Sequence, residues 1–365
     1  MSIIKKKFIF NISPTRVAGA ITYFDNNKKI PVVEYLTQEK INLKKDFSLK
    51  DFRKETLKAI DSVCNDFILE NKIMGNENIF IEDAEVFLMS PWIDYENYSL
   101  KDESLTPFLV NDKYLDNFLL KKNTYKDKDI LSSDITSITA NDYNVDLLDL
   151  RNKKIQKINV SFLDSFLLKF DKHFIDGAIR NNFSLLNIKM NSFLPVLFNQ
   201  IRKIYNPKDD FIFLDISSEI TDFGIFSDGK VSHMMSIPFG INKIINEIMD
   251  VKKVSDSYKA KTFLNMFFSN HLNFNDMELV RKIINKNTDI LKREVERILE
   301  DDGGRLPLNT FVISSVWETN KILKESGIFK NIYFIGEKLL ENFVEFKTGD
   351  RDNFIAVETE YVYDN

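Results

Sequence analysis

The chain has 365 residues, of which 44% are hydrophobic and 29% charged, and this composition is typical of a folded protein with two or three domains. The formal net charge of −5 argues against nucleic acid as the main partner, because nucleic-acid-binding proteins usually carry a basic surface. The single cysteine, Cys64, excludes an intrachain disulfide framework. The three histidines are far apart and lack the spacing of a metal site or a catalytic triad.

Glycine is scarce in this chain. There are 11 glycines, about 3% of the residues, where average usage is about 7%. Glycine allows a ligand to lie directly against the backbone, because it has no Cβ. The composition therefore argues against a protein that binds phosphates in glycine-rich loops.

No segment contains the roughly 18 consecutive apolar residues that are needed to cross a bilayer. The basic N-terminal residues are followed by an apolar run that is too short for a signal peptide. We therefore expect a cytoplasmic protein without direct membrane insertion, and one cysteine is consistent with a reducing compartment.

The first 89 residues predict a β-hairpin, a third strand, a helix and a fourth strand. The two hairpin strands are expected at 7–12 and 17–24, on either side of the turn Ser13-Pro14-Thr15-Arg16. The helix is expected over 49–72, where apolar residues recur at helical spacing. The other two strands are expected at 30–36 and 78–89.

A polar block follows at 90–154. It contains a helix-like stretch at 111–122 and a strand-like stretch at 130–140, and it predicts a small inserted α+β subdomain. After it the pattern predicts a strand at 155–163, a helix at 164–181, a strand at 184–189 and a helix at 193–205.

The order of elements then starts again after a turn at Pro207. Strands are expected at 211–216, 221–226 and 231–237, with the hairpin turn Asp228-Gly229 before the last of them, and a helix begins near Ile241. The remaining predictions are helices within 255–302 and at 318–326, and strands at 310–314, 331–335 and 353–362.

This repetition predicts a duplicated α/β protein. The first half would be discontinuous and comprise 1–89 and 155–206, the inserted subdomain would comprise 90–154, and the second half would comprise 207–365. A ligand would lie most naturally in the cleft between the two halves.

The stretch from Asp215 to Asp222 is the most informative motif, because a strand there ends in a carboxylate, turns tightly and starts again. A tight turn between strands can direct backbone N–H groups at phosphate oxygens, and a carboxylate at the strand end can hold magnesium through water. Taken alone, Asp215 is equally compatible with a turn cap, and Thr221 with simple strand preference.

The stretch resembles the second phosphate-binding hairpin of the actin-like ATPases, and the pattern is most similar to the FtsA and PilM branch. Two further segments match the family in order and spacing. Residues 11–15 match the first phosphate hairpin, and residues 308–315 match the adenosine motif. The resemblance spans essentially the whole chain. It implies an actin-like (ribonuclease H-like) fold, duplicated around a central cleft. The cofactor-binding residues that it implies are Asn11, Ser13, Thr15, Asp215, Ser217, Thr221, Gly240, Ser314 and Ser315.

Several of these residues depart from the family pattern. Asn11 stands where the family has aspartate, which leaves Asp215 as the magnesium-binding candidate. Four serines stand at glycine positions, and each adds a hydroxymethyl group where the nucleotide would lie. These serines are Ser13, Ser217, Ser314 and Ser315. The departures imply that binding of ATP and magnesium is weak or lost, and we assign no catalytic residue. ATP binding without turnover remains the alternative to a fully degenerate site.

Three functions follow from the resemblance. The first is a PilM-like scaffold of pilus or secretion-type assembly, which binds the cytoplasmic peptide of an inner-membrane protein beside the inserted subdomain and so lies at the inner face of the membrane. The second is an FtsA-like cell-division protein that polymerises into filaments and links a tubulin-like filament to the membrane. The acidic tail at 347–365 argues against a basic membrane-binding helix of its own. The third, a sugar-kinase-like phosphotransferase, requires intact phosphate loops and a carboxylate base.

Overall fold

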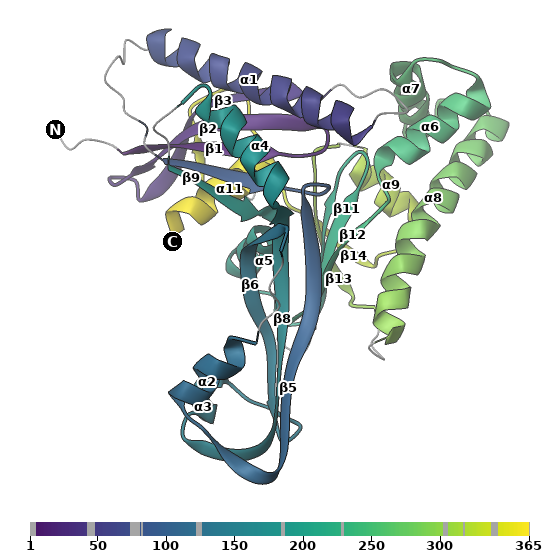
Figure 1. Cartoon of the computed structure of the whole chain (residues 1–365). Helices are drawn as coiled ribbons and strands as arrows, with labels where there is room; N and C mark the ends of the chain where they lie inside the picture. Colours follow the sequence, from purple (N-terminus) through teal and green to yellow (C-terminus); the bar gives the residue numbers. More distant parts are fainter. Residues whose placement is uncertain are drawn as a thin grey trace.

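The computed structural model has three β-sheets among the residues that it describes (Figure 1). The described residues are 5–41, 48–73, 81, 83–121, 126–183, 187–227, 230–301, 306–316, 318–336 and 342–364. The predicted turn at Asp228-Gly229 lies outside these residues.

The first sheet belongs to the N-terminal half. Its strands are β1 (Lys6–Ile12), β2 (Arg16–Asp25), β3 (Ile30–Lys40), β4 (Asp83–Leu88), β9 (Asn187–Ser192) and β15 (Glu345–Phe346). They lie in the order β15-β3-β2-β1-β4-β9. The strand β1 is antiparallel to β2 and parallel to β4, and β4 is parallel to β9.

The second sheet repeats this arrangement. Its strands are β10 (Phe211–Ile216), β11 (Thr221–Ser227), β12 (Lys230–Ile237), β13 (Asn309–Ser314) and β14 (Asn331–Phe334), in the order β12-β11-β10-β13-β14. The strand β10 is antiparallel to β11 and parallel to β13, and β13 is parallel to β14. The predicted duplication is therefore confirmed, because β3-β2-β1-β4-β9 and β12-β11-β10-β13-β14 have the same order and directions, and only β15 has no counterpart in the second sheet.

Two helices, α5 (Phe193–Tyr205) and α11 (Asn353–Asp364), link the halves through one apolar core. The core combines residues of the first sheet, such as Ile9 and Phe87, with Phe213 and Phe311 of the second. The two helices contact each other, and α11 also contacts the first three strands of the chain. A cluster of apolar side chains from both sheets gives the two halves little freedom to separate.

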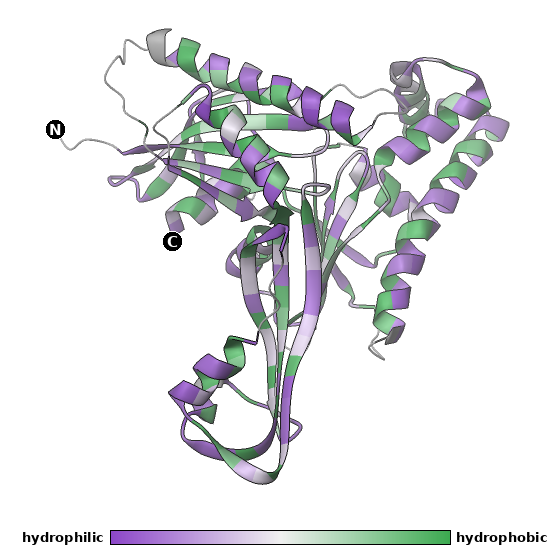
Figure 2. Cartoon of the chain, viewed as in Figure 1, coloured by the Kyte–Doolittle hydropathy of each residue, from purple (hydrophilic) through white to green (hydrophobic). Residues whose placement is uncertain are grey.

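Further helices cover the outer faces of the two sheets. The first sheet packs against α1 (Leu49–Ile73) and α4 (Lys169–Arg180), and the second against α6 (Ile241–Lys252), α7 (Ser257–Phe268), α8 (Phe274–Asp301) and α9 (Thr319–Ser326). Along α1 and α8 hydrophobic and hydrophilic residues alternate at helical spacing (Figure 2), so each helix buries one side. None of the helices in the described ranges has the length and apolar character needed to span a bilayer.

The third sheet forms an arm that extends away from both halves (Figure 1). Its strands are β5 (Ile93–Val110), β6 (Lys128–Ala140), β7 (Tyr143–Asn144) and β8 (Lys153–Leu168), in the order β5-β8-β6-β7. Two short helices, α2 (Asp112–Leu119) and α3 (Leu147–Leu150), lie at its far end. The boundary predicted at residue 154 falls inside β8, which pairs with β5 and β6 along most of its length.

Two element predictions in and after this arm were wrong. The polar stretch 93–110 was not expected to be a strand, yet it forms β5, because its long antiparallel pairing with β8 outweighs its composition. Residues 164–168 continue β8 and do not begin a helix; α4 starts only at Lys169.

The prediction of a strand at 353–362 was also wrong, because this segment is the helix α11. Its β-branched and aromatic residues favour strands, and it is buried from Phe354 to Glu360, so it lacks the polar side that identifies a helix in sequence. The helix begins where Asp352 Oδ1 accepts hydrogen bonds from the backbone N–H groups of Phe354 and Ile355, at 2.9 and 3.1 Å.

Candidate functional site: the cleft between the two hairpins

The turn of the first hairpin, between β1 and β2, is organised by the side chain of Ser13. Ser13 Oγ accepts hydrogen bonds from the backbone N–H groups of Thr15 and Arg16, at 3.3 and 3.1 Å. The Ser13 N–H and Oγ both donate to the carbonyl oxygen of Arg16, each at 3.0 Å. The hydroxyl oxygen therefore lies on the inner side of the turn, where the N–H groups converge.

The turn of the second hairpin, between β10 and β11, has the same hydrogen bonds around Ser217. Ser217 Oγ accepts from the N–H groups of Glu219 and Ile220, at 3.3 and 3.1 Å. Ser217 N–H and Oγ donate to the carbonyl oxygen of Ile220, at 3.0 and 2.7 Å. Both serines are more than nine-tenths buried. The two hairpins are thus structural copies, as the sequence predicted from their motifs.

The third predicted loop follows β13 and also contains a serine that bonds to its own loop. Ser314 Oγ accepts from the N–H of Val316 at 3.0 Å and donates to the carbonyl oxygen of Ile216, at the end of β10, at 2.6 Å. It also lies 2.8 Å from the hydroxyl of Thr319. The adjacent Ser315 is exposed. Ser314 therefore joins this loop to the second hairpin.

Gly240 lies against the second hairpin at the start of α6. A Cβ at this position would be 2.2 Å from the carbonyl oxygen of Ser218, so only glycine allows this approach. The N–H groups of Ile241 and Asn242 donate to the carbonyl oxygens of Ser217 and Ser218, at 3.3 and 2.8 Å. Gly240 and the start of α6 thus hold the hairpin from outside.

The two predicted threonines occupy different positions in their hairpins. Thr221 pairs with Ile216 in the register of the second hairpin, as Val17 pairs with Ile12 in the first, so Thr221 corresponds to Val17 and not to Thr15. The Thr221 hydroxyl is fully buried and donates to the carbonyl oxygen of Phe239 at 2.8 Å. Thr15 lies in the turn itself and is partly exposed.

Asn11, at the end of β1, contacts a residue that the sequence motifs did not assign to the site. Asn11 Nδ2 donates a hydrogen bond to Oε1 of Glu358 in α11, and both side chains are fully buried. Burial raises the pKa of Glu358 well above its ordinary value, the hydrogen bond from Asn11 opposes this effect, and the nearby negative charges of Asp352 and Asp215 add to it. A carboxylate therefore lies beside the first hairpin.

Asp215, the end residue of β10, is almost fully buried. Burial raises its pKa well above the ordinary value, repulsion by Asp222 raises it further, and attraction by Arg16 lowers it. Within the described part of the chain, Asp215 Oδ1, Glu358 Oε2 and Asn11 Oδ1 have no hydrogen-bond partner. Buried oxygen atoms from both halves therefore lie between the two hairpins.

Asp222 connects the second sheet to the start of the arm. Its Oδ1 accepts a hydrogen bond from Ser236 Oγ at 2.6 Å, and its Oδ2 accepts one from the N–H of Ser90 at 3.2 Å. The hydroxyls of Ser90 and Ser236 lie 2.6 Å apart. Burial raises the pKa of Asp222, and the hydrogen bonds from both serines oppose this rise. Ser90 immediately precedes a cis proline, Pro91.

Arg16 is a cation of this region whose Nη1 already binds acidic and amide groups, while its buried Nε has no hydrogen-bond partner among the described residues. Its guanidinium forms an ion pair with Asp352, and its Nη1 donates to Gln38 Oε1 at 2.5 Å. The guanidinium also lies 5.6 Å from the centre of the Phe354 ring. Among the described residues, no three His, Cys, Asp or Glu side chains are close enough together to hold a metal ion. Metal binding by Asp215 therefore stays a prediction.

Sequence reasoning thus placed Asn11, Asp215 and the turn serines at equivalent points of two hairpins, but it missed the residues that surround them: Arg16, Ser90, Asp222, Ser236 and Glu358. For Glu358 there was a signal, since a charged residue stands within the apolar run 354–357 and 361–362. For the others, contacts between distant parts of the chain decide the role.

The comparisons with known proteins identify the fold. No family model and no curated protein matches the sequence. The solved structure described as the "PilM-PilN type IV pilus biogenesis complex" is similar over 98% of this chain and 96% of that chain, with a TM-score of 0.60 and 11% identity. The ethanolamine utilization protein EutJ from Carboxydothermus hydrogenoformans gives a TM-score of 0.46 at 11% identity over 98% of this chain and 89% of that chain.

A protein of unknown function from Bacteroides thetaiotaomicron, described as having an actin-like ATPase fold, is also similar. It gives a TM-score of 0.39 at 6% identity over 97% of this chain and 95% of that chain. The similarity to the PilM structure, with its TM-score of 0.60 over nearly the full length of both chains, shows the actin-like ATPase fold that the motifs predicted.

Proposed function

We propose that this protein is a PilM-like scaffold that binds the cytoplasmic peptide of an inner-membrane assembly protein along β6, and that it does so without relying on bound ATP. The similarity to PilM over nearly the full length of both chains supports the scaffold. The observation that carries the proposal is a groove beside the arm, at the place where the inserted block meets the second half.

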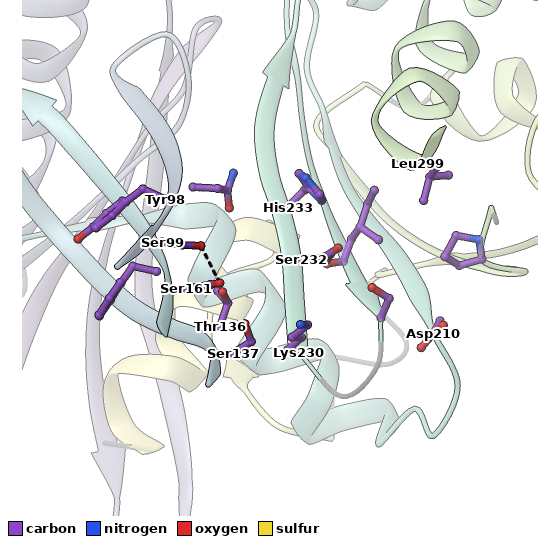
Figure 3. Close-up of a pocket in the computed structure, with 15 residues that line it drawn as sticks. Tyr98, Ser99, Thr136, Ser137, Ser161, Asp210, Lys230, Ser232, His233 and Leu299 are labelled. Carbon is purple, nitrogen blue, oxygen red and sulfur yellow. Dashed lines mark hydrogen bonds between the residues drawn. The ribbon is translucent and has the colours of Figure 1, made fainter. Parts of the chain in front are cut away.

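This β6 groove consists of three adjoining hollows of about 460, 230 and 400 Å³, which all include Thr136 of β6 and Lys230 of β12. In the largest of them, Ser99, Thr136, Ser137 and Ser161 of the arm face Lys230 and other residues of the second half across the hollow (Figure 3). The groove therefore offers space and polar side chains to a bound segment of chain.

The strand β6 can pair with such a segment. At residues 135–138, the part of β6 that lines the groove, the strand partner among the described residues is β8, on one side, and β7 pairs only with Thr139 and Ala140 on the other. A strand edge of this kind can accept an added strand through backbone hydrogen bonds.

The chemistry of the groove indicates what the peptide contains. In the smallest hollow the ring centres of Phe198 and Phe226 are 5.6 Å apart, and the guanidinium carbon of Arg202 is 5.5 Å from the centre of the Phe226 ring. Lys230 and Asp134 also line this hollow, so its lining is apolar with charges of both signs. We expect an extended peptide with apolar side chains and with charged groups that can pair with these residues.

The test measures binding of synthetic peptides with the sequences of the cytoplasmic tails of the cell's small inner-membrane proteins, by fluorescence anisotropy with the full chain. Ile135→Lys adds a charge to the groove and should weaken binding by at least about tenfold. Leu105→Lys makes the same kind of change on β5, at a residue that is 98% exposed and lines none of the three hollows, and should have no effect. If no tail binds, or if both variants bind equally well, the proposal is wrong.

No observation in the described part of the chain favours the FtsA-like or the phosphotransferase alternative. The phosphotransferase would need a carboxylate base facing a phosphate site. Asn11 is an amide whose Nδ2 is bonded to Glu358, and Asp215 is only 3% exposed.

A further inference from the structure

In both hairpins a serine hydroxyl accepts the backbone N–H groups of the turn, and this determines whether the turns can bind a phosphate. In a phosphate-binding turn, free backbone N–H groups point at the ligand. Here the N–H groups of both turns donate to a serine hydroxyl of the same turn, at 3.1–3.3 Å. The oxygen of Ser13 or Ser217 occupies the place that a phosphate oxygen would take.

The electrostatics of the cleft act in the same direction. Glu358, Asp215 and Asp222 are three buried acidic side chains in this region, and burial raises the pKa of each of them. The nearby cation, Arg16, forms an ion pair with Asp352. A nucleotide carries several negative charges, and in this poorly solvated region it would meet acidic side chains and a cation that is already paired.

The residues present therefore do not fit a nucleotide and its magnesium ion. We propose that Ser13 and Ser217 act as built-in substitutes for phosphate, which satisfy both turns from within and make the cleft a closed structural interface that excludes nucleotide. This inference concerns the same protein as the proposed scaffold function but does not depend on the β6 groove, so either can fail without the other.

Ser13 and Ser217 exclude nucleotide through the oxygen of the side chain, which accepts the N–H groups of the turn, and not only through its bulk. Ser314 supports the same conclusion, since its hydroxyl accepts from Val316 N–H and donates to the end of β10. In all three loops that would surround a nucleotide, a serine hydroxyl thus accepts backbone N–H groups of its own loop.

The first experiment measures hydrogen–deuterium exchange of individual backbone amides in the full chain. In S13A/S217A the amides of Thr15, Arg16, Glu219 and Ile220 lose their acceptor and should exchange at least about tenfold faster. The matched control is Ser104→Ala in the arm, where Ser104 Oγ accepts from Thr106 N–H at 3.3 Å; there only the local amide should respond. Unchanged exchange in the cleft would overturn the proposal.

The second experiment titrates a fluorescent ATP analogue with magnesium into wild type and into S13G/S217G. Wild type should not saturate below about 1 mM, and the glycine variant should bind at least about tenfold more tightly. Wild-type binding tighter than about 100 µM would overturn the proposal. So would a folded glycine variant whose amides exchange faster but which binds no more tightly than wild type. A thermal unfolding scan shows whether each variant is folded.

Discussion

Asn11 and Glu358 are 347 positions apart in the chain, yet the amide of Asn11 donates a hydrogen bond to the carboxyl group of Glu358 in the buried cleft. This contact joins the first hairpin to the helix α11, which comes from the end of the second half. In the sequence, Asn11 is visible only as the loss of the family's aspartate; the structure shows that its amide binds Glu358 instead.

The variant Glu358→Gln tests the buried charge, because it keeps an oxygen for Asn11 and removes the ionisable group. The pKa of Glu358 is raised from 4.5, so the folded protein binds more protons than the unfolded chain above that pH. The wild-type free energy of unfolding should therefore fall as pH rises through this window.

At pH 8 the variant should be more stable than wild type by about 1 kcal/mol or more, and its stability should depend less on pH. Urea denaturation from pH 5 to 8 measures this. Glu294→Gln on α8, where Glu294 pairs with Arg297 at the surface, is the control and should change the free energy of unfolding by less than about 0.5 kcal/mol. Identical profiles for wild type and Glu358→Gln would contradict the prediction.

The variant Asn11→Asp restores the aspartate of the family pattern, and we expect it to destabilise the protein. It places a second carboxylate against Glu358 and removes the amide donor, which should cost about 3 kcal/mol at neutral pH. The double variant N11D/E358Q should regain most of this loss. Chemical denaturation of the four proteins of this cycle measures the coupling, and additive effects would argue against the contact.

Gly240 and Gly177 provide a matched pair of glycine-to-alanine changes at helices. Gly240→Ala would place a Cβ 2.2 Å from the Ser218 carbonyl oxygen, so we expect a loss of about 3 kcal/mol. Gly177 lies inside α4, and a methyl group added there would meet no atom within 4 Å, so alanine should stabilise by about 0.5–1 kcal/mol. Thermal scans distinguish the opposite signs. Equal shifts would show that the start of α6 does not need glycine.

The contact between Ser90, Asp222 and Ser236 should contribute to the closed cleft. Ser236→Ala removes the 2.6 Å hydrogen bond to a buried carboxyl group, and we expect it to cost about 2 kcal/mol. Ser99→Ala is the control, because Ser99 also lies 3.0 Å from a serine hydroxyl, that of Ser161, but on an exposed part of the arm. Its loss should be below about 0.5 kcal/mol. Denaturation midpoints of both variants test the difference.

The sequence by itself determined the duplicated α/β architecture and the positions of both hairpins. The central strands β1 and β10 are short, strongly apolar runs, and each is followed by a turn and a second strand. These signals are local, and buried strands with tight turns do not depend on distant residues for recognition. The altered positions, Asn11 and the turn serines, were also visible in sequence.

Only the tertiary structure decided what those altered residues do. The strand β5 exists because β8 pairs with it, and α11 is a helix that packs on α5 and on the first three strands, so neither element follows from its own composition. The roles of Glu358, Asp222 and Arg16 likewise arise from contacts between segments far apart in the chain. The sequence shows which side chain stands at an altered position, but the hydrogen bonds of that side chain depend on which atoms folding brings within about 3 Å of it.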